Sequence, residues 1–244
     1  MKTRLTPNHP YHRRRGFTLT ELLVVIVIIV VLAALSITGI QRMRDGADKV
    51  TSSRNLSQLQ FANASYAADH NGVYVPLYAT NDEGARTGFW YQDPTYLSYL
   101  IGDVSDAAGK PVRAVPPAYL DSKVYRARKS MYYSMAASFG MSESGLMGRT
   151  GPNVKAAHSM NQIPNPAGAM AFATATDYRV GYNARFAWAD EQPRTASAIA
   201  YRHAETAVIV YFDGHIAAVS KGDIKEIDSS RGGKNHAFWN PRAD

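Results

Sequence analysis

A chain of 244 residues and 26.8 kDa is long enough for one domain with an anchoring segment. Its residues are 45% hydrophobic and 11% aromatic, which excludes a wholly disordered chain and predicts a folded core. Because it contains no cysteine, the sequence excludes a disulfide framework, a cysteine-ligated metal centre and a thiol nucleophile.

The formal net charge of +7 is concentrated at the N-terminus. The rest of the chain holds 22 of the 27 Lys and Arg residues against all 20 Asp and Glu residues, so it is close to neutral. We therefore expect no nucleic-acid partner, because the electrostatic basis for one is missing. The basic residues of the tail, residues 1–16, are Lys2, Arg4, Arg13, Arg14 and Arg15.

An apolar run follows the basic tail and occupies residues 17–40, with Glu21 as its only charge. As a helix, residues 22–40 span about 28 Å, close to the roughly 30 Å of a bilayer's hydrocarbon core. We expect residues 17–40 to form a transmembrane helix. The basic tail predicts a cytoplasmic N-terminus and places the rest of the chain outside the cytoplasm.

An ordinary secretory signal is an alternative reading of the same segment. Such a signal has a basic region, an apolar region of about 7 to 15 residues and a cleavage site of small residues. Ala34-Leu35-Ser36 offers a site of that kind. The longer apolar run, the carboxylate at its start and the helical pattern beyond it favour a retained helix.

The junction between the tail and the apolar run reads Arg-Arg-Arg-Gly-Phe-Thr-Leu-Thr-Glu over residues 13–21. It resembles the processing site of type IV pilins and type II secretion pseudopilins. The resemblance implies that a prepilin peptidase cuts between Gly16 and Phe17, removes residues 1–16 as a leader and N-methylates Phe17. It also implies that the apolar helix is retained as the core of a filament.

Glu21 is unusual because a carboxylate inside an apolar span costs up to roughly 2.5 to 3.5 kcal/mol at the membrane centre. Near a helix N-terminus the macrodipole lowers that cost, and the carboxylate is in reach of the new amine of Phe17. The resemblance implies that Glu21 pairs with such an amine during assembly. A tolerated interfacial charge is the simpler alternative.

Residues 41–71 are expected to continue the helix as an amphipathic segment, for a total of about 50 residues. Gly39 and Gly46 are weak points in it, and Asn71-Gly72 predicts its end. One side of this segment is predicted to face inward, because mostly apolar or small residues recur on it every three or four positions: Met43, Ala47, Val50, Ser53, Leu56, Leu59 and Ala62. A second stretch is similar to a large bacterial subfamily of pilin-like proteins at Asn55, Leu56, Gln58, Leu59, Ala62, Tyr66, Ala67, Asp69, Gly72 and Pro76.

Residues 72–244 predict an extracytoplasmic head of short strands and loops, separated by turn signals. The expected fold is α+β and pilin-like, with the long N-terminal helix packed on an antiparallel β-sheet. We expect a short helix at residues 94–101 and a loop at 140–151. Strand-like runs lie at residues 87–91, 131–135, 170–174, 185–188 and 197–201.

Asp213-Gly214 lies between two apolar runs and predicts a hairpin at residues 206–220, closed by a type I′ turn. With His203 it matches the H-x9-D-G element of the same pilin-like subfamily, for which we assign no chemistry. His203, Asp213 and His215 are also the residue types of a metal site or an acid–base pair. A structural role for all three is the favoured interpretation, and we expect no cofactor and no metal.

Two other groups of residues have simple structural interpretations. Arg126, Arg128 and Lys129 are interpreted as a solvated basic face. The 15 Tyr and three Trp residues are interpreted as packing within the sheet rather than as a glycan-binding patch. No nucleotide-binding or hydrolase motif was found in the sequence.

The resemblance implies a non-enzymatic structural subunit of a type II secretion pseudopilus or a type IV pilus-like filament, located in the inner membrane. Its expected partners are a prepilin peptidase, other pilin-like subunits, an assembly platform and the membrane. Two alternatives stay open: an anchored extracytoplasmic binding protein that does not polymerise, and an exported hydrolase.

Overall fold

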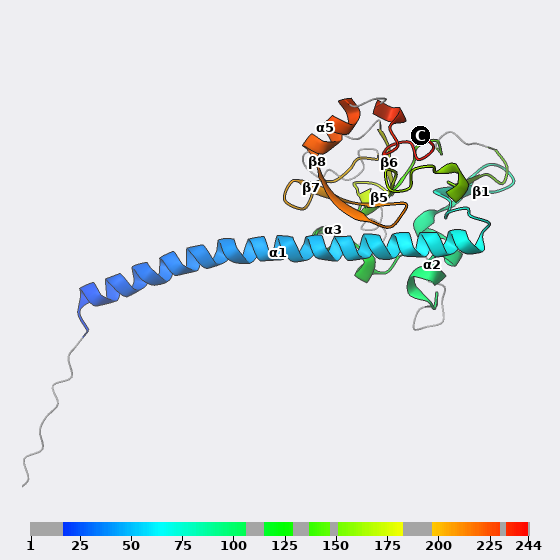
Figure 1. Ribbon diagram of the computed structural model, residues 1–244. Helices are drawn as coiled ribbons and strands as arrows, with labels where there is room; N and C mark the ends of the chain where they lie inside the picture. The colour runs from blue at the N-terminus through cyan, green and yellow to red at the C-terminus, as the bar shows by residue number, and fades with distance from the viewer. Residues whose placement is uncertain are drawn as a thin grey trace, which may run out of the picture. The chain divides into compact units, whose positions relative to one another are not determined.

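The computed structural model describes residues 17–105, 115–128, 137–146, 151–182, 197–229 and 233–243 (Figure 1). It contains two compact units, which meet within one helix, between Arg44 and Asp45.

The described part of the first unit, residues 17–44, comprises the N-terminal part of helix α1 and the two residues before it; α1 runs from Leu19 to Asp69. None of its most apolar 18-residue window is buried. By length and composition, α1 can cross a membrane. The helix continues without interruption through the expected weak points Gly39 and Gly46.

The second unit holds the outer part of α1 and all the strands. A three-stranded antiparallel sheet has the order β2-β1-β4, and a five-stranded sheet has the order β6-β3-β5-β7-β8. The strands are β1 (Tyr78–Thr80), β2 (Arg86–Phe89), β3 (Phe139–Ser142), β4 (Lys155–Ala156), β5 (Met170–Thr174), β6 (Arg179–Val180), β7 (Thr206–Tyr211) and β8 (Ile216–Ser220). The other helices are α2 (Pro94–Ile101), α3 (Ser122–Arg128) and α5 (Lys221–Ser229).

The five-stranded sheet is a layer with a core on each face. In β7, Val208 and Val210 face the core that includes Leu56 and Leu59 of α1. The alternate residue Ile209 faces a second core beneath α5 and the C-terminal segment. Figure 1 shows α1 and α5 on opposite sides of this sheet. The expected α+β class, with the helix packed on a sheet, is therefore confirmed.

The large sheet is mixed rather than purely antiparallel, because β3 and β6 pair in parallel. Gly140 of β3 explains this contact, since an added Cβ would lie 2.7 Å from the Arg179 carbonyl carbon. Only glycine permits such a close approach of two backbones. The expected loop at residues 140–151 is therefore wrong at its start, where residues 140–142 belong to a strand.

Several predicted elements are found at their expected positions. α2 and β5 coincide with the predicted ranges 94–101 and 170–174. Residues 197–201 form only an isolated bridge, between Ile199 and Ala175, and α5 was not predicted. The predicted strands at residues 131–135 and 185–188 lie outside the described residues.

The end of α1 agrees with the predicted stop signal. The helix ends at Asp69, and both Asn71 and Gly72 have positive φ, at 54° and 75°. The Gly72 amide donates to the Ala67 carbonyl at 2.8 Å, which satisfies one of the last free carbonyls of the helix.

Candidate functional site

Thr18 and Glu21 form a reciprocal contact at the start of α1. The Glu21 carboxylate accepts hydrogen bonds from the Thr18 amide and the Thr18 hydroxyl, both at 2.8 Å. The Glu21 amide donates to the Thr18 hydroxyl at 3.3 Å. This is a capping box, in which residues three apart satisfy each other's free helix-end donors. Thr-Leu-Thr-Glu carries that signal, and the sequence analysis missed it.

The capping box holds the Glu21 carboxylate against Thr18, which is the second residue after the expected cleavage point. Phe17 precedes Thr18 and is 75% exposed, while Gly16 lies outside the described residues. Cleavage before Phe17 would create a charged amine next to the Thr18 amide, from which the Glu21 carboxylate already accepts a hydrogen bond. In the structure the partner of the Glu21 carboxylate is Thr18.

The same segment was compared with known families. Residues 11–37 match the family model for the prokaryotic N-terminal methylation motif. The chain carries a prepilin-type N-terminal segment. Such segments are typical of type IV pilin-like and pseudopilin proteins, a structural rather than an enzymatic class. No curated protein and no solved structure matches the chain.

Beyond the prepilin segment, α1 turns a polar face toward the head. Asp48, Ser52 and Asn55 are buried, whereas Met43 and Val50 are 77% and 69% exposed. The inward positions predicted for this stretch are therefore wrong at Met43, Ala47 and Val50, which are all exposed. The reason is that the opposing segment presents charges and backbone carbonyls, which polar side chains satisfy and apolar ones cannot.

Two ion pairs join this face of α1 to α3. Asp45 lies 2.7 Å from the Lys123 ammonium, and the Asp48 carboxylate receives two hydrogen bonds from Arg126 at 2.5 and 3.1 Å. The pairs match because both the carboxylates and the cations are three residues apart, on one face of each helix. Arg126 is therefore not simply part of a solvated basic face, although its side chain is 59% exposed. Lys129 of that expected face lies outside the described residues.

Asp121 lies at the centre of a buried polar cluster. One carboxylate oxygen caps α3 by accepting from the Lys123 and Val124 amides at 2.9 and 3.2 Å. The other oxygen accepts from the Ser52 hydroxyl at 3.1 Å and lies 3.3 Å from His203 Nε2. Burial raises the pKa of Asp121, but the hydrogen bond with His203 and the charge of Arg202 outweigh it and lower the pKa to about 2.

The structural role favoured for His203 takes the form of a buried contact rather than an exposed position. It is 1% exposed, and its side chain contacts the Asp121 carboxylate. The neighbouring Arg202 donates to the carbonyls of Ser138, Ala137 and Ala175 at 3.1, 2.5 and 2.7 Å. Asp121, Arg202 and His203 are all buried among the described residues.

The other half of the H-x9-D-G element forms the tip of the β7–β8 hairpin. The predicted type I′ turn is wrong, because only Gly214 has positive φ, at 94°, and Asp213 does not. The Gly214 amide donates to the Tyr211 carbonyl at 2.9 Å, and the Tyr211 amide donates to the His215 carbonyl at 3.0 Å. This is a three-residue loop with glycine in the left-handed conformation.

Asp213 and His215 make their own exposed contact. Asp213 Oδ1 accepts from the His215 amide at 3.0 Å and lies 2.7 Å from His215 Nδ1. The His215 ring stacks on Tyr211 with centroids 4.1 Å apart. His203 and the Asp213–His215 pair lie beyond opposite ends of β7, so the three polar residues do not converge. Across the described ranges, no group of three or more potential metal ligands is found.

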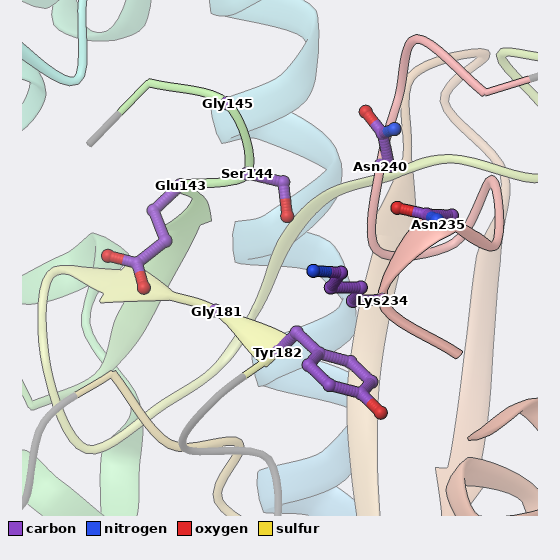
Figure 2. Close-up of a pocket in the computed structure, with 8 residues that line it drawn as sticks. All are labelled: Glu143, Ser144, Gly145, Gly181, Tyr182, Lys234, Asn235 and Asn240. Carbon is purple, nitrogen blue, oxygen red and sulfur yellow. The ribbon is translucent and has the colours of Figure 1, made fainter. Parts of the chain in front are cut away.

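A polar pocket of about 300 Å³ lies between β6 and the C-terminal segment (Figure 2). Its acidic residue, Glu143, forms an ion pair with Arg179 at 2.9 Å. In Figure 2 the Glu143 carboxylate points away from Lys234, so the pocket does not bring these two charges together. The remaining lining residues are Ser144, Gly145, Gly181, Tyr182, Asn235 and Asn240. We assign this pocket no ligand.

Proposed function

We propose that the chain is a structural subunit of a type II secretion pseudopilus or a type IV pilus-like filament. A prepilin peptidase removes residues 1–16 by cutting between Gly16 and Phe17, and the new N-terminus is methylated. The subunit then resides in the inner membrane with residues 17–40 spanning it and the head outside. Other pilin-like subunits and an assembly platform are its partners.

One observation carries this proposal: the methylation motif at residues 11–37 overlaps the start of a helix whose most apolar 18-residue window is not buried by any of the described residues. A lipid bilayer or the helices of other subunits would cover this window. Within a filament, van der Waals packing would replace lipid contacts and add little hydrophobic driving force, so polar groups would contribute to specificity. Glu21 is the acidic group in the span that can do so.

N-terminal sequencing and intact mass of membrane-extracted protein test the processing step. The expected mature chain begins at N-methyl-Phe17. A start near Ile37 would support ordinary signal cleavage and an exported protein, and an intact Met1 would support a simple anchor. Either result would overturn the proposal.

Two variants separate the competing proteases. Gly16→Ala is expected to leave more uncleaved precursor, because a methyl group next to the scissile bond hinders access of the peptidase. Ala34→Leu is the matched control, since it disrupts the small-residue site that a signal peptidase would use. If Ala34→Leu blocks processing and Gly16→Ala does not, the prepilin interpretation is wrong.

A further inference from the structure

The H-x9-D-G element spans the strand that crosses the core next to α1. Ala204 and Glu205 make a tight turn, the six residues of β7 follow, and Phe212 precedes Asp213. Two turn residues, the strand and Phe212 thus fill the nine positions of the spacing. Val208 and Val210 of the strand belong to the same core as Leu56 and Leu59 of α1.

The histidine end of the element reaches α1 through a carboxylate. His203 Nε2 lies 3.3 Å from Asp121 Oδ2, and the Ser52 hydroxyl of α1 donates to that same oxygen at 3.1 Å. All three side chains are buried. The Asp121 carboxylate therefore links the start of β7 to the first buried turns of α1. Contacts with a charged group are strong in such a buried, low-dielectric site.

The backbone before this strand is strained where it presents His203. Ala204 and Glu205 have positive φ, at 49° and 60°, although neither is glycine. His203 and Thr206 nevertheless exchange both backbone hydrogen bonds, at 3.1 and 3.0 Å. Holding a non-glycine residue at such a φ costs about 1 to 3 kcal/mol. The conformation persists only where surrounding contacts fix the backbone in it. The His203 contact with Asp121 is one such contact.

The Asp-Gly end of the element reaches α1 through a backbone carbonyl. Gln60 donates to the Phe212 carbonyl at 2.8 Å from a side chain that is 2% exposed. Asn63 holds Gln60 by donating to its side-chain oxygen at 3.1 Å. Gly214, in the left-handed conformation, closes the loop that aims the Phe212 carbonyl at the helix.

We propose that the H-x9-D-G element is a two-point clamp that holds the head on α1. His203 fixes one point through Asp121 and Ser52, and the loop before Asp213-Gly214 fixes the other through Gln60. Ser52 and Gln60 are eight residues apart, or about 12 Å along a helix, so the two points are separated by more than two turns. His203 is a positioning residue, because it acts on α1 through Asp121.

Hydrogen exchange read by mass spectrometry on the full-length protein in detergent micelles tests the clamp independently of filament assembly. His203→Ala is expected to speed exchange of α1 amides at residues 48–56 about tenfold, because it removes the buried contact of the imidazole with the Asp121 carboxylate. Amides at residues 58–66 should change less than about twofold. Gln60→Leu is expected to produce the reverse pattern.

His215→Ala is the matched control, because it removes the exposed histidine of the same hairpin and should leave both parts of α1 unchanged. Equal effects of His203→Ala and His215→Ala would overturn the clamp, as would faster exchange spread evenly along α1 in either single variant.

A double-mutant cycle tests whether His203 acts through Asp121. In an Asp121→Asn background, His203→Ala should add less than about a twofold further increase in exchange at residues 48–56. A full additional tenfold effect would show that His203 contacts α1 by another route and would refute the assignment. If the alanine variant does not fold, His203→Gln enters the same cycle with the same criteria.

Discussion

The two ends of α1 use polar and apolar residues in opposite ways. In the prepilin segment, apolar side chains such as Val27 and Ile29 are more than half exposed, and the one acidic residue is satisfied locally by Thr18. In the head, the same helix exposes Phe61, which is 72% exposed, and buries Asp48 and Asn55.

This contrast shows that hydropathy alone does not reveal which side of a helix is covered. The N-terminal half of α1, residues 19–40, is the part that we propose spans the membrane and is called the membrane half. Its described side chains are exposed, and apolar residues lie on every side of it. In the head half, α3 and the segment before it offer cations and carbonyls, so the buried side is polar between residues 48 and 55, about two turns. What lies opposite the helix decides which residues face inward.

The largest expected effect concerns the membrane half. Glu21→Ala should insert at least as well as wild type, because it removes a charge from an apolar span, yet its assembly into filaments or crosslinked oligomers should fall more than about tenfold. Crosslinking between single engineered cysteines measures this directly, since the chain has no cysteine of its own. Thr20→Ala, in the same helical turn, is the control and should assemble normally. Wild-type assembly by Glu21→Ala would identify Glu21 as a tolerated interfacial charge.

The next effect tests the reversed hydropathy of the head half. Asn55→Leu adds apolar surface at a buried site but leaves the Ala118 and Leu120 carbonyls without the donor that contacts both at 3.1 Å. We expect a loss of about 2 to 4 kcal/mol in the free energy of unfolding, measured by urea titration in micelles. Phe61→Ser, on the opposite side of the helix, should change it by less than about 0.5 kcal/mol. A stabilising Asn55→Leu would show that the polar face is dispensable.

A smaller effect is expected from acid. Asp121 has an ordinary pKa of 3.8 and a folded pKa lowered to about 2. Its contribution to stability is therefore fully present above the unfolded pKa and is lost as pH falls through the folded pKa, for a total of about 2 kcal/mol. Fluorescence of the buried Trp90 and Trp239 during urea titrations at pH values near 5 and 2 measures the loss. Asp121→Asn should lack this acid-dependent step, whereas Asp213→Asn, at the exposed hairpin tip, should retain it.

The sequence predicted those features that depend on local signals. Asn71-Gly72 predicted the end of α1, and Pro94 after Asp93 agrees with the start of α2, where Asp93 accepts from the Tyr96 amide at 3.0 Å. Asp213-Gly214 predicted a hairpin but not its turn type. The type I′ expectation failed because a three-residue loop places only the glycine at positive φ.

Features that depend on distant contacts were not predictable in this way. Nothing near His203 in the sequence identifies Asp121 as its partner, because 82 positions of chain separate them and only the packed sheet and α1 bring them together. The parallel pairing of β3 with β6 is a similar case. Gly140 permits it, but a lone glycine in the sequence indicates a turn as readily as a close backbone contact.

The smallest effect concerns the local capping of the membrane half. Thr18→Ala removes the hydroxyl that donates to Glu21 at 2.8 Å and accepts from its amide at 3.3 Å, while the Thr18 backbone amide still reaches the carboxylate. We expect the first turn of α1 to lose about 1 kcal/mol of stability, seen as roughly fivefold faster exchange of the Glu21 amide in micelles. Thr18→Ser keeps the hydroxyl and should exchange like wild type. This cap involves only local contacts, so neither variant should alter the urea unfolding of the head. A measurable change in head stability would show that the two parts of α1 are energetically coupled, although they have different contacts.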